Sequence, residues 1–319
     1  MSLRSATSAA VPGRRSRAPQ PRSNSPRRRE LGRNAFGSAL LAPQTLGFLV
    51  VGIIAVGGVV QLSLTRVNVL AGTREFVGLD NYTRLFSDPD MVVVLANTFF
   101  FVFVLSIAGT IVALALALLL NQQLPGINFF RAAIFIPALV TTVAWVLVWR
   151  FILQPQGLLD SLLSVVGIGQ LPWLRGGWLT LGAFAVIQLT KNVGINMMIF
   201  LAALQAVPSE LMDAARVDGA GRWQRFRNVV LPQISPAILM VFMLMVSGSF
   251  RVFELVLLIT NGGPGNQTSV LAFEIYSQAF RLNDVGYAAA LAVFLFVLVL
   301  ALTGIIWQLR RKLVFHESE

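Results

Sequence analysis

The residues best suited to bind a solute are four polar side chains inside an otherwise apolar stretch, residues 178–206. Gln188, Asn192 and Asn196 recur at every fourth position, so a helix places them on one face, with Lys191 three positions from Gln188. Side-chain amides donate and accept hydrogen bonds, as hydroxyl-rich ligands require. The stripe is a candidate solute-facing surface. The alternatives are polar contact between helices, or pairing of Lys191 with a carboxylate of a partner chain.

Two further ionisable residues, Arg251 and Glu254, lie three positions apart near the end of another apolar run, residues 233–259. A charge inside a membrane is costly, so each needs a partner or a function. The two side chains pair with each other on one helix face, or they line a cavity or gate. The sequence leaves both interpretations open.

The residue types that catalysis needs are scarce. The chain has no cysteine, and its single histidine, His316, lies near the C-terminus. The two lysines, Lys191 and Lys312, do not follow glycine, so no phosphate-binding loop of the G-x-x-x-x-G-K-[ST] type exists. We expect no enzyme activity, cofactor or metal in this chain. If the protein works with ATP and magnesium, a separate subunit hydrolyses the ATP.

Composition favours a membrane protein. Hydrophobic residues make up 56% of the 319 residues and charged residues 12%, with a mean hydropathy of +0.74. A soluble domain has about 25% charged residues. The net charge of +11 comes mostly from the N-terminal stretch and from loops beside apolar runs, which membrane topology explains without nucleic acid.

Six apolar runs are long enough to span a bilayer, which needs about 20 residues in a helix. Because the runs do not alternate, they indicate helices rather than a barrel. The prediction is an all-α polytopic membrane protein with a disordered basic tail (1–33), a six-helix domain (34–312) and a short C-terminal tail (313–319). The predicted spans are residues 40–64, 92–120, 131–153, 178–206, 233–259 and 286–309.

The distribution of arginine and lysine predicts the orientation. One side of the membrane receives 17 of these residues and the other side five, with three in or at the edges of spans. Positive residues gather on the cytoplasmic side. Both termini and the loop of residues 207–232 are therefore expected in the cytoplasm.

That loop, here called the polar loop (residues 207–232), carries seven charged residues between two apolar spans. Ala214 and Ala215 lie in a helix-forming run, Gly219 supplies a break, and a second helical stretch contains Trp223. The pattern predicts a helix–turn–helix outside the bilayer on which a partner docks. An amphipathic segment held by lipid headgroups is the alternative.

The spacing of the polar loop resembles a known signature. Asp213-Ala214-Ala215, three residues, Gly219, nine residues and Val229-x-Leu231-Pro232 resemble the E-A-A motif of permease subunits from binding-protein-dependent ABC importers. Asp213 stands where the family has glutamate, and Val229 where it has isoleucine. Both exchanges are conservative.

Two other runs are similar to carbohydrate permeases of the maltose and glycerol-phosphate type. Gly157-Leu158-Leu159 and Trp173-Leu174 follow the third span, and Thr260-Asn261-Gly262-Gly263-Pro264-Gly265 with Thr268 resembles the first of the two permeases. The resemblance covers about residues 40–309.

The resemblance implies a sugar importer of the bacterial inner membrane. A second permease, two ABC ATPase subunits, an extracytoplasmic solute-binding protein and lipid would be its partners. ATP-driven closure of the ATPases would rock the permeases between inward- and outward-facing states. The residues implied for coupling to the ATPase are Glu210, Asp213, Ala214, Ala215, Asp218, Gly219, Ala220, Arg222 and Trp223.

Other functions stay open at this point. The same machinery could import a glycerol phosphodiester or a polyol. A secondary transporter is less favoured, since Glu254 is the one acidic residue clearly inside a predicted span and no internal repeat is visible. A membrane enzyme would have little chemistry to use.

Overall fold

The computed structural model describes residues 26–68 and 72–313, with side chains for residues 41–67 and 72–308. Most of the predicted basic tail and residues 314–319 lie outside the described residues, although the first helix already begins at Pro26. Contacts divide the chain into residues 1–56 and residues 57–319, and the described part of the first unit is helical.

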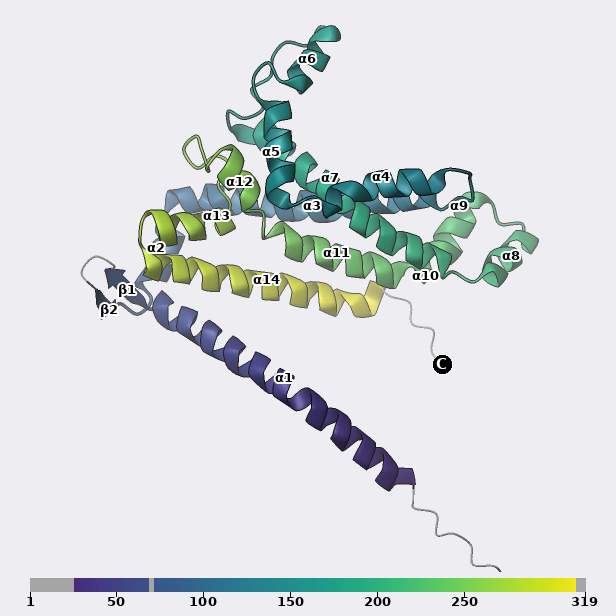
Figure 1. Ribbon diagram of the computed structural model, residues 1–319, viewed down its shortest axis with the longest axis horizontal. Helices are drawn as coiled ribbons and strands as arrows, with labels where there is room; N and C mark the ends of the chain where they lie inside the picture. Colours follow the sequence, from purple (N-terminus) through teal and green to yellow (C-terminus); the bar gives the residue numbers. More distant parts are fainter. Residues whose placement is uncertain (1–25, 69–71, 314–319) are drawn as a thin grey trace, which may run out of the picture. The chain divides into compact units, whose positions relative to one another are not determined.

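Helices dominate the described residues (Figure 1). In chain order the elements are α1 (Pro26–Ser63), β1 (Thr65–Asn68), β2 (Thr73–Phe76), α2 (Asp80–Ser87), α3 (Pro89–Leu120), α4 (Ile127–Leu139), α5 (Thr142–Leu153), α6 (Leu158–Val165), α7 (Gly177–Gln205), α8 (Ser209–Val217), α9 (Arg222–Arg225), the π-helical turn η1 (Phe226–Val230), α10 (Leu231–Gln233), α11 (Ser235–Ser249), α12 (Glu254–Ile259), α13 (Leu271–Tyr276), the π-helical turn η2 (Ser277–Arg281) and α14 (Val285–Leu313).

Four helical stretches among the described residues are long and apolar enough to cross a membrane. They are Leu41–Ser63, Pro89–Leu120, Gly177–Gln205 and Val285–Gln308. Two bent pairs also qualify, Ile127–Leu139 with Thr142–Val165 at 102° and Arg222–Gln233 with Ser235–Ser249 at 67°. Counting each pair as one span gives six, the number predicted from the sequence.

The third predicted span, residues 131–153, was wrong as a single helix. The chain forms α4 and then α5, and the stretch Thr142–Val165, which begins with α5, is bent by 102° from α4. Pro137 lies inside α4 and has no N–H to continue the hydrogen-bond ladder. Just after the break, the Thr141 hydroxyl accepts a hydrogen bond from the Ala144 N–H at 3.4 Å and caps the start of α5.

The fifth predicted span, residues 233–259, is also interrupted. Helix α11 ends at Ser249, and α12 starts only at Glu254. The Arg251 N–H bonds to the Gly248 carbonyl at 3.1 Å, so the chain tightens into a turn instead of continuing the helix. Glycine has low helix propensity, which favours an exit at this point.

The centre of the unit 57–319 is built from α3, α7 and α11. Fully buried side chains from these helices include Phe101, Phe184, Met197, Phe200 and Val241. Within a membrane, such contacts contribute through close van der Waals packing, because lipid is as apolar as the side chains. This packing fixes the rotation of α7 and therefore the direction in which its polar stripe faces.

A two-stranded antiparallel hairpin, β1–β2, occupies part of the segment between the first two predicted spans, so the fold is not entirely helical. Beside it, the Asn81 amide donates to the carbonyls of Ser63 at 2.8 Å and Thr65 at 3.1 Å. We call this region the hairpin end; it comprises β1, β2, α2, the connection from α12 to α13, and the N-terminal turns of α3 and α14. Figure 1 places α8 and α10 at the opposite end of this unit.

The α12–α13 connection is fastened to α3 at the hairpin end. The Asn97 amide donates to the carbonyls of Gln267 at 3.0 Å and Ser269 at 2.9 Å. The Thr98 hydroxyl accepts from the Leu271 N–H at 2.9 Å. Asn97 and Thr98 are buried, so these bonds join distant parts of the chain out of contact with solvent.

Candidate functional site: an amide-lined cavity

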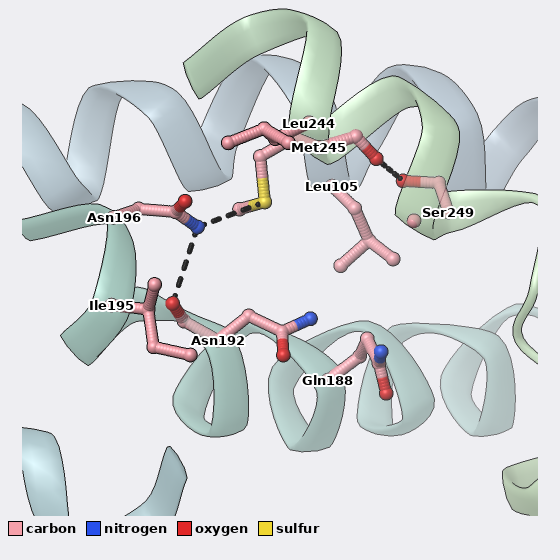
Figure 2. A pocket seen from close by; sticks show the side chains of 9 residues that line it. Leu105, Gln188, Asn192, Ile195, Asn196, Leu244, Met245 and Ser249 are labelled. Atoms are coloured by element: carbon pink, nitrogen blue, oxygen red, sulfur yellow. Dashed lines mark hydrogen bonds between the residues drawn. The ribbon is translucent and has the colours of Figure 1, made fainter. Parts of the chain in front are cut away.

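A cavity of about 250 Å³ lies between α3, α7 and α11 (Figure 2). Its polar wall comes from α7 and its apolar wall mainly from α3 and α11. The lining residues are Leu105, Gln188, Asn192, Ile195, Asn196, Leu244, Met245, Gly248 and Ser249. None of these residues carries a charge, so the described lining is neutral.

The structure brings three of the predicted stripe residues together at this cavity. Gln188 and Asn192 are half-buried, and neither side-chain amide has a hydrogen-bond partner among the described residues. Figure 2 shows both side chains beside the cavity, one helical turn apart on α7. Their donors and acceptors are therefore available to a ligand or to water.

Asn196 has a different environment from the other two amides. It is 5% exposed, and its amide donates to the Asn192 carbonyl at 3.1 Å and approaches the Met245 sulfur at 3.2 Å. Across the cavity, the Ser249 hydroxyl donates to the Met245 carbonyl at 2.6 Å. Asn196 thus ties α7 to α11 at the C-terminal end of the stripe.

Lys191 does not line this cavity. Its ammonium donates to the carbonyls of Val140 at 2.5 Å and Pro137 at 3.4 Å, on the α4–α5 side of α7. The sequence left open polar contact between helices or pairing with a carboxylate of a partner chain, and these bonds to carbonyls are polar contacts between helices. The assignment of Lys191 as a solute ligand stays a prediction.

Arg251 lies in the interruption between α11 and α12, and Glu254 is the first residue of α12. Among the described side chains no ion pair joins them, and Arg251 is exposed. The break removes the continuous helix that a spacing of three requires for contact. Neither residue lines the amide cavity, so a gating function for them remains a prediction.

The polar loop forms the helix–turn–helix that the sequence predicted. Helix α8 buries none of its residues, and neither does α9. Asp213 and Arg216 form an exposed ion pair at 2.6 Å on α8. Trp223 is 69% exposed, and its ring lies tilted at 33° to that of Phe226, with 5.6 Å between the centroids.

The turn after α8 explains the spacing of its motif residues. The Ala220 N–H bonds to the Ala215 carbonyl at 2.9 Å, and the Gly219 N–H bonds to the Arg216 carbonyl at 3.0 Å. These two bonds form a Schellman motif, which needs a left-handed residue just past the helix end. Gly219 fills that position with φ +76°.

The remaining predicted coupling residues lie on the surface of the same loop. Asp218 is the C-cap of α8, and Arg222 is the first residue of α9; neither has an ion pair among the described residues. Glu210 lies in the first turn of α8, and Ala214 lies one turn further along. The structure therefore gathers the predicted set on one loop, while its docking to an ATPase stays a prediction.

Sequence reasoning missed the α3 and α11 walls of the cavity. Leu105, Leu244 and Met245 are ordinary apolar residues of their spans, and no local pattern distinguishes them. Ser249 gives a weak signal as a hydroxyl near the end of a span. These residues became visible only through the packing of three helices.

Residues 109–314 match the family described as "Binding-protein-dependent transport system inner membrane component". The match includes α7, the polar loop and α11. The chain belongs to this family. It is therefore a multi-pass component of the inner membrane, and the resemblance carried by the polar loop is confirmed.

Members of known sugar systems are similar over most of the chain. The trehalose/maltose transport system permease protein MalF of Thermococcus litoralis is 33% identical, covering 84% of this chain and 91% of that protein. The arabinooligosaccharides transport system permease protein AraP of Bacillus subtilis is 34% identical, covering 82% and 84%. The multiple sugar-binding transport system permease protein MsmF of Streptococcus mutans is 32% identical, covering 75% and 81%.

Solved structures confirm the fold. A chain of a bacterial ABC transporter involved in the import of the acidic polysaccharide alginate superposes with a TM-score of 0.78 at 21% identity, covering 90% of this chain and 99% of that one. A second structure, of the bacterial alginate ABC transporter in complex with alginate pentasaccharide-bound periplasmic protein, gives 0.75 at 20% identity, covering 89% and 96%. The fold is that of an ABC-importer permease.

Proposed function

We propose that the chain is the translocation subunit of an ATP-driven importer for a neutral sugar of the disaccharide or oligosaccharide type. The observation that carries this proposal is the pair of unpartnered amides, Gln188 and Asn192, beside a cavity without charge. Sugar hydroxyls pair well with such amides. The sugar systems of the similar proteins support the same class of solute.

A phosphorylated or acidic solute fits this cavity poorly. Binding an anion away from water needs a cation or several aimed donors. No charged residue lies among the described lining residues, and the ammonium of Lys191 is engaged by carbonyls on the α4–α5 side of α7. The proposal therefore favours a sugar over a glycerol phosphodiester.

The proposed assembly places the polar loop and both termini in the cytoplasm. A second permease completes the translocation path, two ABC ATPase subunits receive the polar loops, and an extracytoplasmic binding protein delivers the solute. This chain itself has no phosphate-binding loop, which supports ATP hydrolysis by the separate subunits. The exposed faces of α8 and α9 support the docking assignment, since they bury no residue within the chain.

Purification in a gentle detergent, followed by mass spectrometry, tests the assembly. We expect a second six-span permease and an ATPase with a Walker motif to accompany the tagged chain. Recovery of this chain alone, as a stable and transport-competent protein, would overturn the proposal and favour a secondary transporter.

The solute site is tested by uptake of labelled maltose, trehalose and an arabino-oligosaccharide into cells that express the whole system. For whichever probe is transported, Gln188→Leu and Asn192→Leu should raise the half-saturation concentration or abolish uptake. Thr190→Val is the matched control, because within the described part of the chain the Thr190 hydroxyl bonds only to carbonyls of α7 itself. Unchanged uptake in both leucine variants would remove the amides from the site, and exclusive uptake of an anionic solute would contradict the neutral class.

A further inference from the structure

The bend between α4 and α5 leaves backbone carbonyls at the end of α4 in need of hydrogen-bond donors. The last carbonyls of a helix have no N–H donor within it. Val140, which follows α4, has an extended backbone with ψ 141°, so the next residues turn away instead of supplying donors. Inside a membrane, water is not at hand to replace them, and each unsatisfied group costs several kcal/mol.

Lys191 supplies the missing donors. Its ammonium donates to the carbonyls of Val140 at 2.5 Å and Pro137 at 3.4 Å, and the residue is only 8% exposed. A cation at the C-terminal end of a helix is also favoured by the helix dipole. Helix α4 has 13 residues, enough for that dipole to act at its end.

The same side of α7 contacts both arms of the bend. The Trp145 indole of α5 donates to the Ile187 carbonyl at 3.2 Å. Towards the other end, a Cβ added at Gly194 would lie 2.5 Å from the Ile134 carbonyl oxygen of α4. Ile187, Lys191 and Gly194 are spaced by four and three residues, so they share one helix face.

We infer that Lys191 is a positioning residue that holds the 102° bend of the third span against α7. The contact is to backbone, so it sets the angle between α4 and α5 and not the chemistry of the solute site. By holding this bend, Lys191 controls the position of α5 relative to Gln188 and Asn192 on α7. This inference does not depend on the identity of the solute.

The bend is measurable directly, because the chain has no native cysteine. Spin labels on cysteines that replace Phe129 in α4 and Phe151 in α5, 73% and 68% exposed, report the distance between the two arms. The full chain is assembled with its partners in lipid nanodiscs, and the distance between the two spin labels is measured by pulsed electron–electron double resonance. The unaltered bend should give one narrow distance distribution.

Lys191→Met removes the donors while keeping an unbranched side chain, and it should broaden the distribution and shift its maximum. Lys191→Arg retains donors on a longer side chain and should restore the narrow distribution. Thr190→Val, the neighbouring control, should leave it unchanged. A distribution for Lys191→Met identical to that of the unaltered chain would overturn the inference.

Uptake provides a second readout that distinguishes positioning from solute binding. Lys191→Met should lower the maximal rate with little change in half-saturation concentration, and Lys191→Arg should recover the rate. A raised half-saturation concentration at constant maximal rate would make Lys191 a solute ligand and refute its positioning function. If Lys191→Met does not accumulate, Lys191→Gln is measured instead. Its side chain is uncharged and one atom shorter, so a bend indistinguishable from that of the unaltered chain, together with normal uptake, would overturn the inference. Failure of the importer proposal would appear as missing partners, whereas failure of this inference would appear as an unchanged bend.

Discussion

The hairpin end and the polar loop are held in different ways. At the hairpin end, buried Asn81, Asn97 and Thr98 bond to backbone groups far along the chain. In the polar loop, the side-chain bonds join near neighbours, such as Asp213 with Arg216, and α8 buries no residue. The first region is fastened to its own chain by buried hydrogen bonds. The polar loop has its local helical structure but leaves its surface exposed, and an exposed surface is what a docking element requires.

The largest expected effect comes from the turn that shapes the polar loop. Gly219→Val places a β-branched residue at φ +76°, which costs about 1–2 kcal/mol and lowers the ratio of native to non-native turn roughly five- to thirtyfold. We expect uptake to fall by up to that factor, with normal amounts of protein in the membrane. Measurements of uptake and membrane content check this.

Gly221→Ala is the matched control for that prediction. Gly221 has φ −65°, and an added Cβ meets its nearest atom, Gln224 Oε1, at 3.7 Å, an ordinary contact. Its uptake should stay close to normal. Normal uptake by Gly219→Val would show that the shape of the turn is not needed for coupling.

At the hairpin end, the main expected effect is on stability. Asn97→Leu leaves the carbonyls of Gln267 and Ser269 without their donor, at about 1–3 kcal/mol each. The thermal midpoint of the purified assembly should fall clearly. Asn128→Leu, at an exposed position with one 3.4 Å contact, serves as the control. Equal midpoints for the two variants would contradict the view that this end is fastened by buried bonds.

A smaller effect is expected from the surface of the hairpin end. Arg84 pairs with Asp284 at 2.6 Å and lies over the Tyr287 ring at 4.0 Å. Because the ion pair is exposed, Arg84→Ala should cost about 1 kcal/mol in all. Thermal unfolding compared with Arg74→Ala, at an exposed arginine of β2, measures the difference. A fall in thermal midpoint as large as that of Asn97→Leu would show that surface contacts stabilise the hairpin end as much as its buried bonds do.

The smallest expected effect is in the polar loop. Asp213→Asn removes one exposed ion pair between residues three apart on α8, worth about 0.3–0.5 kcal/mol at most. The thermal midpoint of the isolated chain should not change measurably. A clear fall would mean that α8 packs on its own chain, and the contrast between the two regions would fail.

Local patterns predicted the features that depend on near neighbours. The spacing of Gln188 and Asn192 placed both amides at one cavity, and the Ala215-to-Gly219 spacing predicted the turn after α8. Both rest on helical periodicity and on the conformational freedom of glycine, which act within a few residues.

Features that depend on packing escaped the sequence. Continuous hydropathy concealed the break before Thr141, although Pro137 was a usable signal. The partners of Lys191 are carbonyls more than 50 positions away, and backbone groups carry no sequence signature. The hairpin β1–β2 was missed because its strands have only four residues each.

Helix α7 runs without interruption from Gly177 to Gln205, and α8 starts at Ser209. At 1.5 Å per residue, its 29 residues form a lever arm of about 44 Å. A tilt of about 10° at one end would carry the other end through ~8 Å, a distance of the order of a sugar ring's width. The two amides lie near the middle of that arm. A movement imposed on α8 would therefore displace the two amides by about half as much. They would move as part of a rigid helix, without a local rearrangement.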